Sequence, residues 1–144
     1  MSTQRSLVLV KPDGVARGLT GEIIGRFEKL GLKLMALRML QMDRALAERH
    51  YAVHKSKPFF DGLVSYIISG PIVAAIFEGE NAIDLIRKTM GATDPAKAEK
   101  GTIRGDLGVS LEQNTVHGSD AVETAKTEMA LYFTERDIVS YRRG

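Results

Sequence analysis

Short β-prone runs alternate with helical segments along this sequence, and their order constrains the fold more than any other feature. Each run is apolar, spans few residues and stops at a residue that breaks a β-ladder or starts a turn. The predicted strands are Ser6–Val10, Leu32–Gln41, Ile72–Phe77 and a short run that contains Thr115 and Val116. None of these runs is long enough to span a bilayer. We therefore expect no membrane segment.

Helical periodicity fills the segments between these runs. The predicted helices are Thr20–Leu30, Asp43 to about Lys55, Phe59 to about Ser69, Asn81–Met90 and a last helix that starts near Asp120. Side chains that commonly cap helices stand at four of these starts, namely Thr20, Asp43, Asn81 and Ser119 or Asp120. Pro58 separates the second helix from the third, so we expect these two to form a hairpin.

The order of elements is strand, helix, strand, helical hairpin, strand, helix, long loop, strand and helix. This order predicts an α+β fold of the ferredoxin-like (split βαβ) type. The expected architecture is a four-stranded antiparallel sheet covered by helices, with an inserted helical hairpin and a long loop before the last strand. The sequence shows no internal repeat and no linker, so residues 1–144 are expected to form a single domain.

Composition excludes several classes of function. The 144 residues carry a formal net charge of +2, which does not argue for nucleic acid as the main partner. The sequence has no cysteine, which excludes disulfides and thiolate chemistry. Because cysteine-free chains suit a reducing compartment, we expect a cytoplasmic location.

The stretch Asn114–Asp120 carries the candidate nucleophile. The β-branched residues Thr115 and Val116 favour a strand, and Gly118 lets the backbone turn. His117 is therefore expected at the end of a strand, beside the N–H groups of the following helix, where phosphate binds readily. A neutral imidazole in such a position can attack a phosphoryl group. A lone histidine at a strand end also fits a structural or surface role.

Two other features bear on the chemistry. The stretch 91–112 is a loop of roughly 22 residues rich in Gly, Thr, Asp, Pro and Lys, and loops of this length in small domains are usually functional. The sequence has no P-loop pattern and no H-R-D set, so a phosphotransferase built on it needs a nucleophile of its own.

Two further histidines, His50 and His54, lie close together in the sequence. His50 and His54 are spaced to share one helical face, a spacing that can hold zinc. However, Tyr51 rather than a glutamate follows His50, and no third ligand is evident. We interpret both histidines as solvated helix residues.

Three motifs resemble those of the nucleoside diphosphate kinase family. They are N-x-x-H-G-S-D at Asn114–Asp120, K-P-D-G-V at Lys11–Val15 and G-T-I-R-G-D at Gly101–Asp106. Similar matches recur from Lys11 to Glu128, so the resemblance covers nearly the whole chain. It implies a phosphotransferase that moves the γ-phosphate of a nucleoside triphosphate to a nucleoside diphosphate. The implied mechanism is ping-pong through a phosphohistidine on His117, with broad base and sugar tolerance.

The resemblance also implies roles for individual residues. The implied catalytic set is His117, Lys11, Tyr51, Asn114, Ser119 and Glu128. The implied nucleotide-binding set is Lys11, Phe59, Leu63, Arg87, Thr93, Arg104, Leu111 and Asn114. In the family, the matching glutamate bonds the second nitrogen of the histidine ring, and the matching phenylalanine stacks on the base. No residue is assigned to a metal, because Mg²⁺ is expected to arrive with the nucleotide. The implied assembly is a homo-oligomer, with a hexamer favoured over a tetramer.

Two other classes of protein stay open from the sequence. Ferredoxin-like sheets also bind RNA through aromatic side chains on the sheet face, but the predicted strands carry Leu, Val and Ile and show no RNP1-like run. A regulatory or scaffold protein that kept the fold and lost turnover also fits the sequence. Labelling of the chain by a nucleoside triphosphate would separate the enzyme from both.

Overall fold

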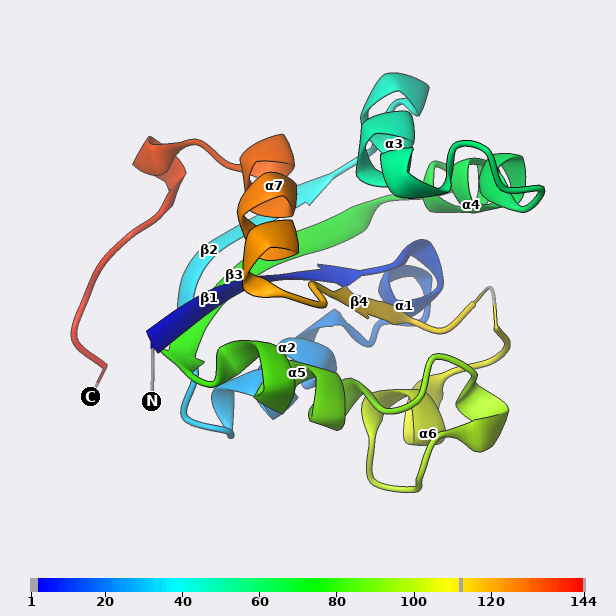
Figure 1. Cartoon of the computed structure of the whole chain (residues 1–144). Coiled ribbons are helices and arrows are strands. Elements are labelled where there is room, and N and C mark those ends of the chain that lie inside the picture. The colour runs from blue at the N-terminus through cyan, green and yellow to red at the C-terminus, as the bar shows by residue number, and fades with distance from the viewer. Residues whose placement is uncertain (1–2, 112, 144) are drawn as a thin grey trace.

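A four-stranded antiparallel sheet forms the centre of the computed structural model, which describes residues 3–111 and 113–143 (Figure 1). The strands are β1 (Thr3–Val10), β2 (Lys33–Leu40), β3 (Ile72–Glu80) and β4 (Val116–Gly118). They lie in the order β2-β3-β1-β4, and each neighbouring pair is antiparallel. This order is that of the ferredoxin-like fold, which confirms the predicted fold class.

Helices connect the strands in the predicted order, with additions. The α-helices are α1 (Pro12–Ala16), α2 (Thr20–Glu28), α3 (Arg44–His50), α4 (Phe60–Ile67), α5 (Ala82–Met90), α6 (Ile103–Leu107) and α7 (Val122–Tyr132). The short 3₁₀ helices are η1 (Ala52–His54), η2 (Pro95–Lys97) and η3 (Glu135–Asp137). The predicted loop 91–112 therefore contains η2 and α6, and its last residue, Glu112, lies outside the described residues.

Each face of the sheet packs against its own layer of helices, because strand side chains alternate between the two faces. Leu7 and Leu9 of β1 belong to a core with side chains of α3, α4 and α7. Val8 and Val10 belong to a second core with side chains of α2, α5 and α6. Figure 1 shows these two groups of helices on opposite sides of the sheet.

The predicted helix caps are only partly right. At the start of α3, Asp43 accepts a hydrogen bond from the N–H of Leu46 at 2.8 Å, which confirms that cap. Thr20 is the first residue of α2 and Leu19 occupies the cap position without a side-chain bond, so the Thr20 prediction is wrong. Gly31, which follows α2, has a φ of 86°, a conformation that glycine adopts without strain.

The cap predicted for α5 is also wrong. Asn81 occupies the cap position with a φ of 53°, but its side chain makes no cap bond. Gln4 of β1 supplies the bond instead, since its Oε1 accepts from the N–H of Ile83 at 3.1 Å. A side chain distant in sequence thus accepts a hydrogen bond from a free N–H in the first turn of this helix.

Neither Ser119 nor Asp120 caps α7. The helix begins at Val122, and Ala121 holds the cap position without a side-chain bond. Ser119 is fully buried and its hydroxyl bonds a side chain further along α7. The helix that follows the candidate nucleophile therefore starts later than predicted.

The C-terminal segment returns along β2. The N–H of Val139 donates to the carbonyl of Met35 at 2.8 Å, and the Tyr141 hydroxyl donates to the carbonyl of Leu34 at 2.6 Å. In the part of the chain that the structure describes, no helix has the length and apolar character needed to cross a bilayer.

Candidate active site

A cavity of about 330 Å³ opens where β4 approaches α3, α5 and α7. The predicted site residues that line it are Lys11, Tyr51, Arg87, Thr93, Arg104, Asn114, His117 and Glu128. The predicted site residues that do not line it are Phe59, Leu63, Leu111 and Ser119. The fold therefore brings together most of the residues that the motifs single out, although they come from distant parts of the chain.

A larger hollow, of about 770 Å³, lies elsewhere, beside β1, α7 and the C-terminal segment. Among the described residues, no histidine lines this hollow. The smaller cavity is the better candidate for chemistry, because it gathers a nucleophile, cations and hydroxyl groups in one place.

The sheet determines which way His117 faces. His117 lies opposite Leu9 of β1, and its neighbour Val116 is buried in the core on the side of α2 and α5. The alternation along β4 therefore turns His117 to the other face, toward α3 and α7. There its Nε2 lies 2.9 Å from Oε1 of Glu128, and the hydroxyl of Ser119 donates to the same oxygen at 2.8 Å.

The contact with Glu128 determines the state of the His117 ring. A carboxylate only accepts hydrogen bonds, so Nε2 carries a proton, and in the neutral ring the lone pair lies on Nδ1. No group among the described residues hydrogen-bonds Nδ1, and the His117 side chain is 24% exposed. Burial alone would raise the pKa of Glu128, but the hydrogen bonds and charges around it, chiefly from His117, outweigh burial and lower this pKa. The nitrogen that opens on the cavity is thus a free nucleophile.

Lys11 and Asn114 form a second pair in the cavity. Lys11 Nζ donates to Asn114 Oδ1 at 2.8 Å, and Asn114 Nδ2 donates to the carbonyl of Thr93 at 3.1 Å. Burial, followed by the charge of Arg104, lowers the pKa of Lys11 from 10.5 to about 8, although Asp13 opposes the shift. An anionic ligand would therefore stabilise the charged form of Lys11.

Arg104 is held by two backbone carbonyls, and one of its three nitrogens has no hydrogen-bond partner among the described residues. Its Nη1 donates to the carbonyl of Gly91 at 3.0 Å, and its Nη2 donates to the carbonyl of Val116 at 2.9 Å. Its Nε is buried and has no hydrogen-bond partner among the described residues. Burial, followed by the charge of Arg87, lowers the pKa of Arg104 to about 10. A buried cationic donor without an acceptor favours an anionic ligand.

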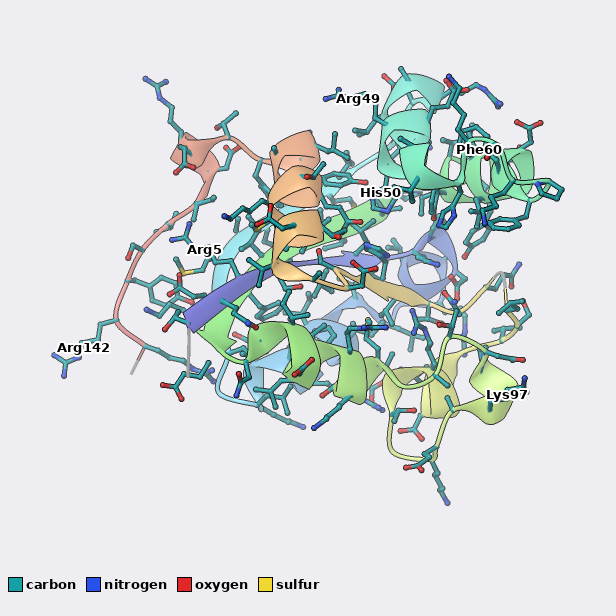
Figure 2. All side chains as sticks on the ribbon, viewed as in Figure 1. Arg5, Arg49, His50, Phe60, Lys97 and Arg142 are labelled. Atoms are coloured by element: carbon teal, nitrogen blue, oxygen red, sulfur yellow. The ribbon has the colours of Figure 1, made fainter. Side chains whose placement is uncertain are left out.

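His50 contradicts its prediction as a solvated helix residue. It is 8% exposed, its Nδ1 lies 2.9 Å from the Tyr132 hydroxyl, and its ring meets that of His117 edge-on with centroids 4.8 Å apart. Figure 2 labels it at the end of α3 nearer the sheet. Burial, followed by the charge of His117, lowers the pKa of His50 to about 3, so this ring is neutral at physiological pH. His50 lies one helical turn after the buried Ala47, so the two residues share the buried face of α3.

Two aromatic residues of the helical hairpin, Tyr51 and Phe59, lie at or beside the cavity. Tyr51 lines the cavity, and burial, followed by the charge of Glu128, raises the pKa of Tyr51 to about 12. Its hydroxyl therefore stays protonated and can donate. Phe59 is 50% exposed and packs against His54, which lines the cavity, with ring centroids 5.4 Å apart. Leu63 is half-buried against the core.

Several residues that line the cavity were absent from the predicted set. They are His50, Val53, His54, Met90, Gly118, Asp120 and Thr124. Leu111, which the resemblance implied, is 60% exposed and lies outside the lining. A histidine with one open nitrogen, surrounded by cations and hydroxyl donors, is suited to receive and release a phosphoryl group. The fold and the site together define a phosphotransferase of the α+β class.

A family profile described as "Nucleoside diphosphate kinase" matches residues 4–138. The chain therefore belongs to the nucleoside diphosphate kinase family. This membership confirms the resemblance seen in the motifs and the assignment of the chain to a phosphotransferase family.

Relatives match the chain over nearly its full length. A nucleoside diphosphate kinase from Dehalococcoides mccartyi is 67% identical over 97% of this chain and 99% of its own length. A solved structure of the Halobacterium salinarum enzyme in complex with CDP has a TM-score of 0.95 at 47% identity, and covers 99% of this chain and 95% of that one. A Babesia bovis family member has a TM-score of 0.94 at 45% identity, with coverages of 97% and 95%.

Proposed function

We propose that this protein transfers the γ-phosphate of a nucleoside triphosphate to a nucleoside diphosphate through a phosphohistidine on His117. The observation that carries the proposal is the set of contacts of this ring: Nε2 lies 2.9 Å from Glu128, and Nδ1 has no hydrogen-bond partner among the described residues of a cavity lined by cations. Membership of the family supports the same reaction.

The first half-reaction forms the phosphohistidine. The lone pair of His117 Nδ1 attacks the γ-phosphorus, the bond to the bridging oxygen breaks, and the nucleoside diphosphate leaves with that electron pair. The ring gains positive charge in this step, and the carboxylate of Glu128, itself held by Ser119, stabilises it. A second nucleoside diphosphate then takes the phosphoryl group by the reverse of this step, which gives ping-pong kinetics.

Charge neutralisation is the main demand of phosphoryl transfer. Lys11, Arg87 and Arg104 supply three cations to the cavity. Burial, followed by a neighbouring arginine, lowers the pKa values of Lys11 and Arg104, and an anionic ligand would offset both effects. Tyr51 and Thr93 are suited to donate hydroxyl hydrogen bonds to the phosphates.

We further propose that the sugar and base are held loosely. Lys11 and Asn114 are the candidates to bind the sugar hydroxyls, and Phe59 is the candidate to stack on the base at the mouth of the cavity. Leu63 and Leu111 would at most flank that base. Stacking accepts any base, because every base has a π-face, so we expect broad base and sugar tolerance. The CDP bound to the Halobacterium salinarum relative supports a nucleotide ligand.

We propose that Mg²⁺ enters as part of the nucleotide complex. The group of potential metal ligands found among the described residues is His50, His117 and Glu128, whose ligand atoms lie within 4.8 Å of one another. Imidazole nitrogens do not suit Mg²⁺, which prefers oxygen ligands. The cationic side chains that line the cavity would also repel a metal ion held by these residues. These residues do not fit a resident Mg²⁺ site.

We also propose that the chain forms a homo-oligomer, with a hexamer favoured over a tetramer. β2 lies at the edge of the sheet and exposes Leu37 at 54% and Met39 at 62%, which supports association. Light scattering would measure the assembly. Three other expectations stay predictions: a single domain over residues 1–144, a cytoplasmic location and the lack of a nucleic-acid partner.

Labelling tests the proposed function. The protein is mixed with ATP labelled at the γ-phosphate and Mg²⁺, and nucleotide is then removed. We expect a label that is labile to acid and stable to base, and that passes to added nucleoside diphosphate. An RNA-binding module or an inactive scaffold would stay unlabelled.

Substitutions assign the label among the three histidines of the chain. His117→Ala should abolish both labelling and transfer. His50→Gln and His54→Ala leave the proposed nucleophile in place, so they should retain labelling, although at reduced rates. Ordinary transfer by His117→Ala would refute the nucleophile.

A further inference from the structure

The chain makes a tight, strained turn at Thr115, immediately before β4. Thr115 has a φ of 77°, and the N–H of Val116 donates to the carbonyl of Asn114 at 2.8 Å, which closes a three-residue turn. A positive φ is a genuine outlier for a β-branched residue, and this form of three-residue turn is rare. Asn81 is the other non-glycine residue with a positive φ in the described chain, and asparagine tolerates that conformation better.

This turn orients groups on both sides of it. The carbonyl of Thr115 accepts from the N–H of Lys11 at 2.8 Å. Asn114 precedes the turn and accepts from Lys11 Nζ, and His117 follows it on β4. If Thr115 relaxed to an extended conformation, the bond that closes the turn would break and Asn114 would point away from His117.

Side chains from separate elements hold the turn, and we name Asp13, Tyr66 and Thr115 the Asp13 clasp. Asp13 Oδ2 accepts from the fully buried hydroxyl side chain of Thr115 at 2.9 Å. Asp13 Oδ1 accepts from the hydroxyl of Tyr66, and the N–H of Asp13 donates back to the Tyr66 oxygen at 3.1 Å. Burial, followed by the bond to Asp13, raises the pKa of Tyr66, so its hydroxyl remains a donor.

The members of the clasp act at a distance from the cavity. Asp13, Tyr66 and Thr115 do not belong to its described lining, whereas Asn114 and His117 do. An effect of Thr115 or Tyr66 on phosphoryl transfer therefore passes through the turn, whereas the charge of Asp13 also acts on Lys11 in the cavity. Hydrogen bonds to a charged acceptor are about twice as strong as neutral ones, so Asp13 is well suited to hold a strained backbone.

We propose that Asp13 is a positioning residue: its carboxylate, completed by Tyr66, keeps Thr115 in the left-handed conformation and so aims Asn114 and His117 into the cavity. This inference rests on the proposed transfer through His117. It assigns Asp13 a role in the alignment of the site, separate from binding of substrate.

Substitutions at position 115 separate the backbone conformation from the hydroxyl. Thr115→Val keeps the branched shape and loses the hydroxyl, so kcat and the rate of His117 phosphorylation should fall by about tenfold to hundredfold. Thr115→Ser keeps the hydroxyl and should stay within about threefold of the wild type. Thr115→Gly loses the hydroxyl but adopts a positive φ without strain, so it should recover most of what valine loses.

Two outcomes of this series overturn the proposal. Equal losses in the Val and Gly variants mean that the held backbone is not the cause, and wild-type rates in Thr115→Val mean that the clasp is dispensable. If Thr115→Val does not fold, Tyr66→Phe decides: it should lower kcat several-fold, and wild-type rates would contradict the clasp. Tyr141→Phe is the matched control, because it removes a hydroxyl from the C-terminal segment and should leave kcat unchanged.

A spectroscopic measurement tests the role of the Asp13 clasp without an activity assay. The ¹⁵N resonances of the His117 ring should move in Thr115→Val and return toward wild-type values in Thr115→Gly. Unmoved resonances in Thr115→Val overturn the proposal. If the wild-type protein takes no label from ATP, the proposed function fails, and the resonances alone then judge the role of Asp13.

Discussion

Replacing Lys11 with methionine should stabilise the unliganded protein while weakening its hold on nucleotides. Burial and the charge of Arg104 lower the pKa of Lys11 from 10.5 to about 8. A shift of this size corresponds to about 3 kcal/mol of unfavourable free energy for the charged lysine in the folded state. Methionine removes that charge, but it also removes the hydrogen bond to Asn114, worth about 1 kcal/mol. We expect a net gain of about 1–2 kcal/mol in the free energy of unfolding at pH 7.

The gain should depend on pH in a defined direction. Below about pH 8 the lysine is charged in both the folded and the unfolded chain, so the full cost of its burial is present. Between about pH 8 and 10.5 the unfolded chain binds more protons at Lys11 than the folded chain does, so the wild-type protein gains stability as pH rises. The advantage of the methionine variant should shrink across this window.

Urea denaturation at pH 7 and at pH 10 measures the stability difference, and thermal shift with ADP and Mg²⁺ measures the response to nucleotide. Nucleotide should stabilise the wild type much more than Lys11→Met, because the ligand relieves the unpaired charge. Lys126→Met, at an exposed position of α7, is the control and should change neither measurement. A Lys11→Met protein that is less stable than wild type at both pH values would refute this reasoning.

Three further substitutions test separate parts of the site. Glu128→Gln removes the charge 2.9 Å from His117 Nε2 and should slow phosphorylation of the ring by about tenfold to hundredfold, measured by rapid quench; an unchanged rate would contradict the role of the carboxylate. Tyr132→Phe leaves Nδ1 of the buried His50 without its partner at 2.9 Å and should cost about 1–3 kcal/mol of unfolding free energy in urea, whereas no cost would mean that the bond is not formed. Gly14→Ala places a Cβ 2.8 Å from the last valine of β1 and should cost about 1–3 kcal/mol by thermal denaturation, unless the backbone of α1 shifts freely.

Patterns within one element predicted much of the fold. The apolar run from Ile72 marks the start of β3, because side chains buried on both faces leave no polar alternation to read. The start of β1 at Thr3 was missed, since Gln4 and Arg5 are polar. Gln4 also explains the wrong cap of α5: it bonds Ile83 across a long sequence separation, which no local rule detects.

The candidate site, like the fold, was predicted where local patterns were enough and missed where contacts between distant residues decide. The motifs identified His117 and its cations, but the sequence alone could not derive the contact of Ser119 with Glu128. That contact requires α7 to begin after Ser119, so that Glu128 returns over β4. His50 was misjudged because helical spacing says which residues share a face and does not say what that face meets.

The pairing of β4 with β1 has a consequence for how the protein is made. The bond from the N–H of Leu7 to Ser119 joins residues 112 positions apart, and Lys11 reaches Asn114 across 103 positions. A nascent chain with only its first hundred residues outside the ribosome therefore lacks the edge strand β4 and the candidate nucleophile His117. Contacts between such distant residues form late in folding, because closing so long a segment costs chain entropy before the contacts themselves contribute stability. A chain at that stage of synthesis therefore cannot carry out the proposed transfer.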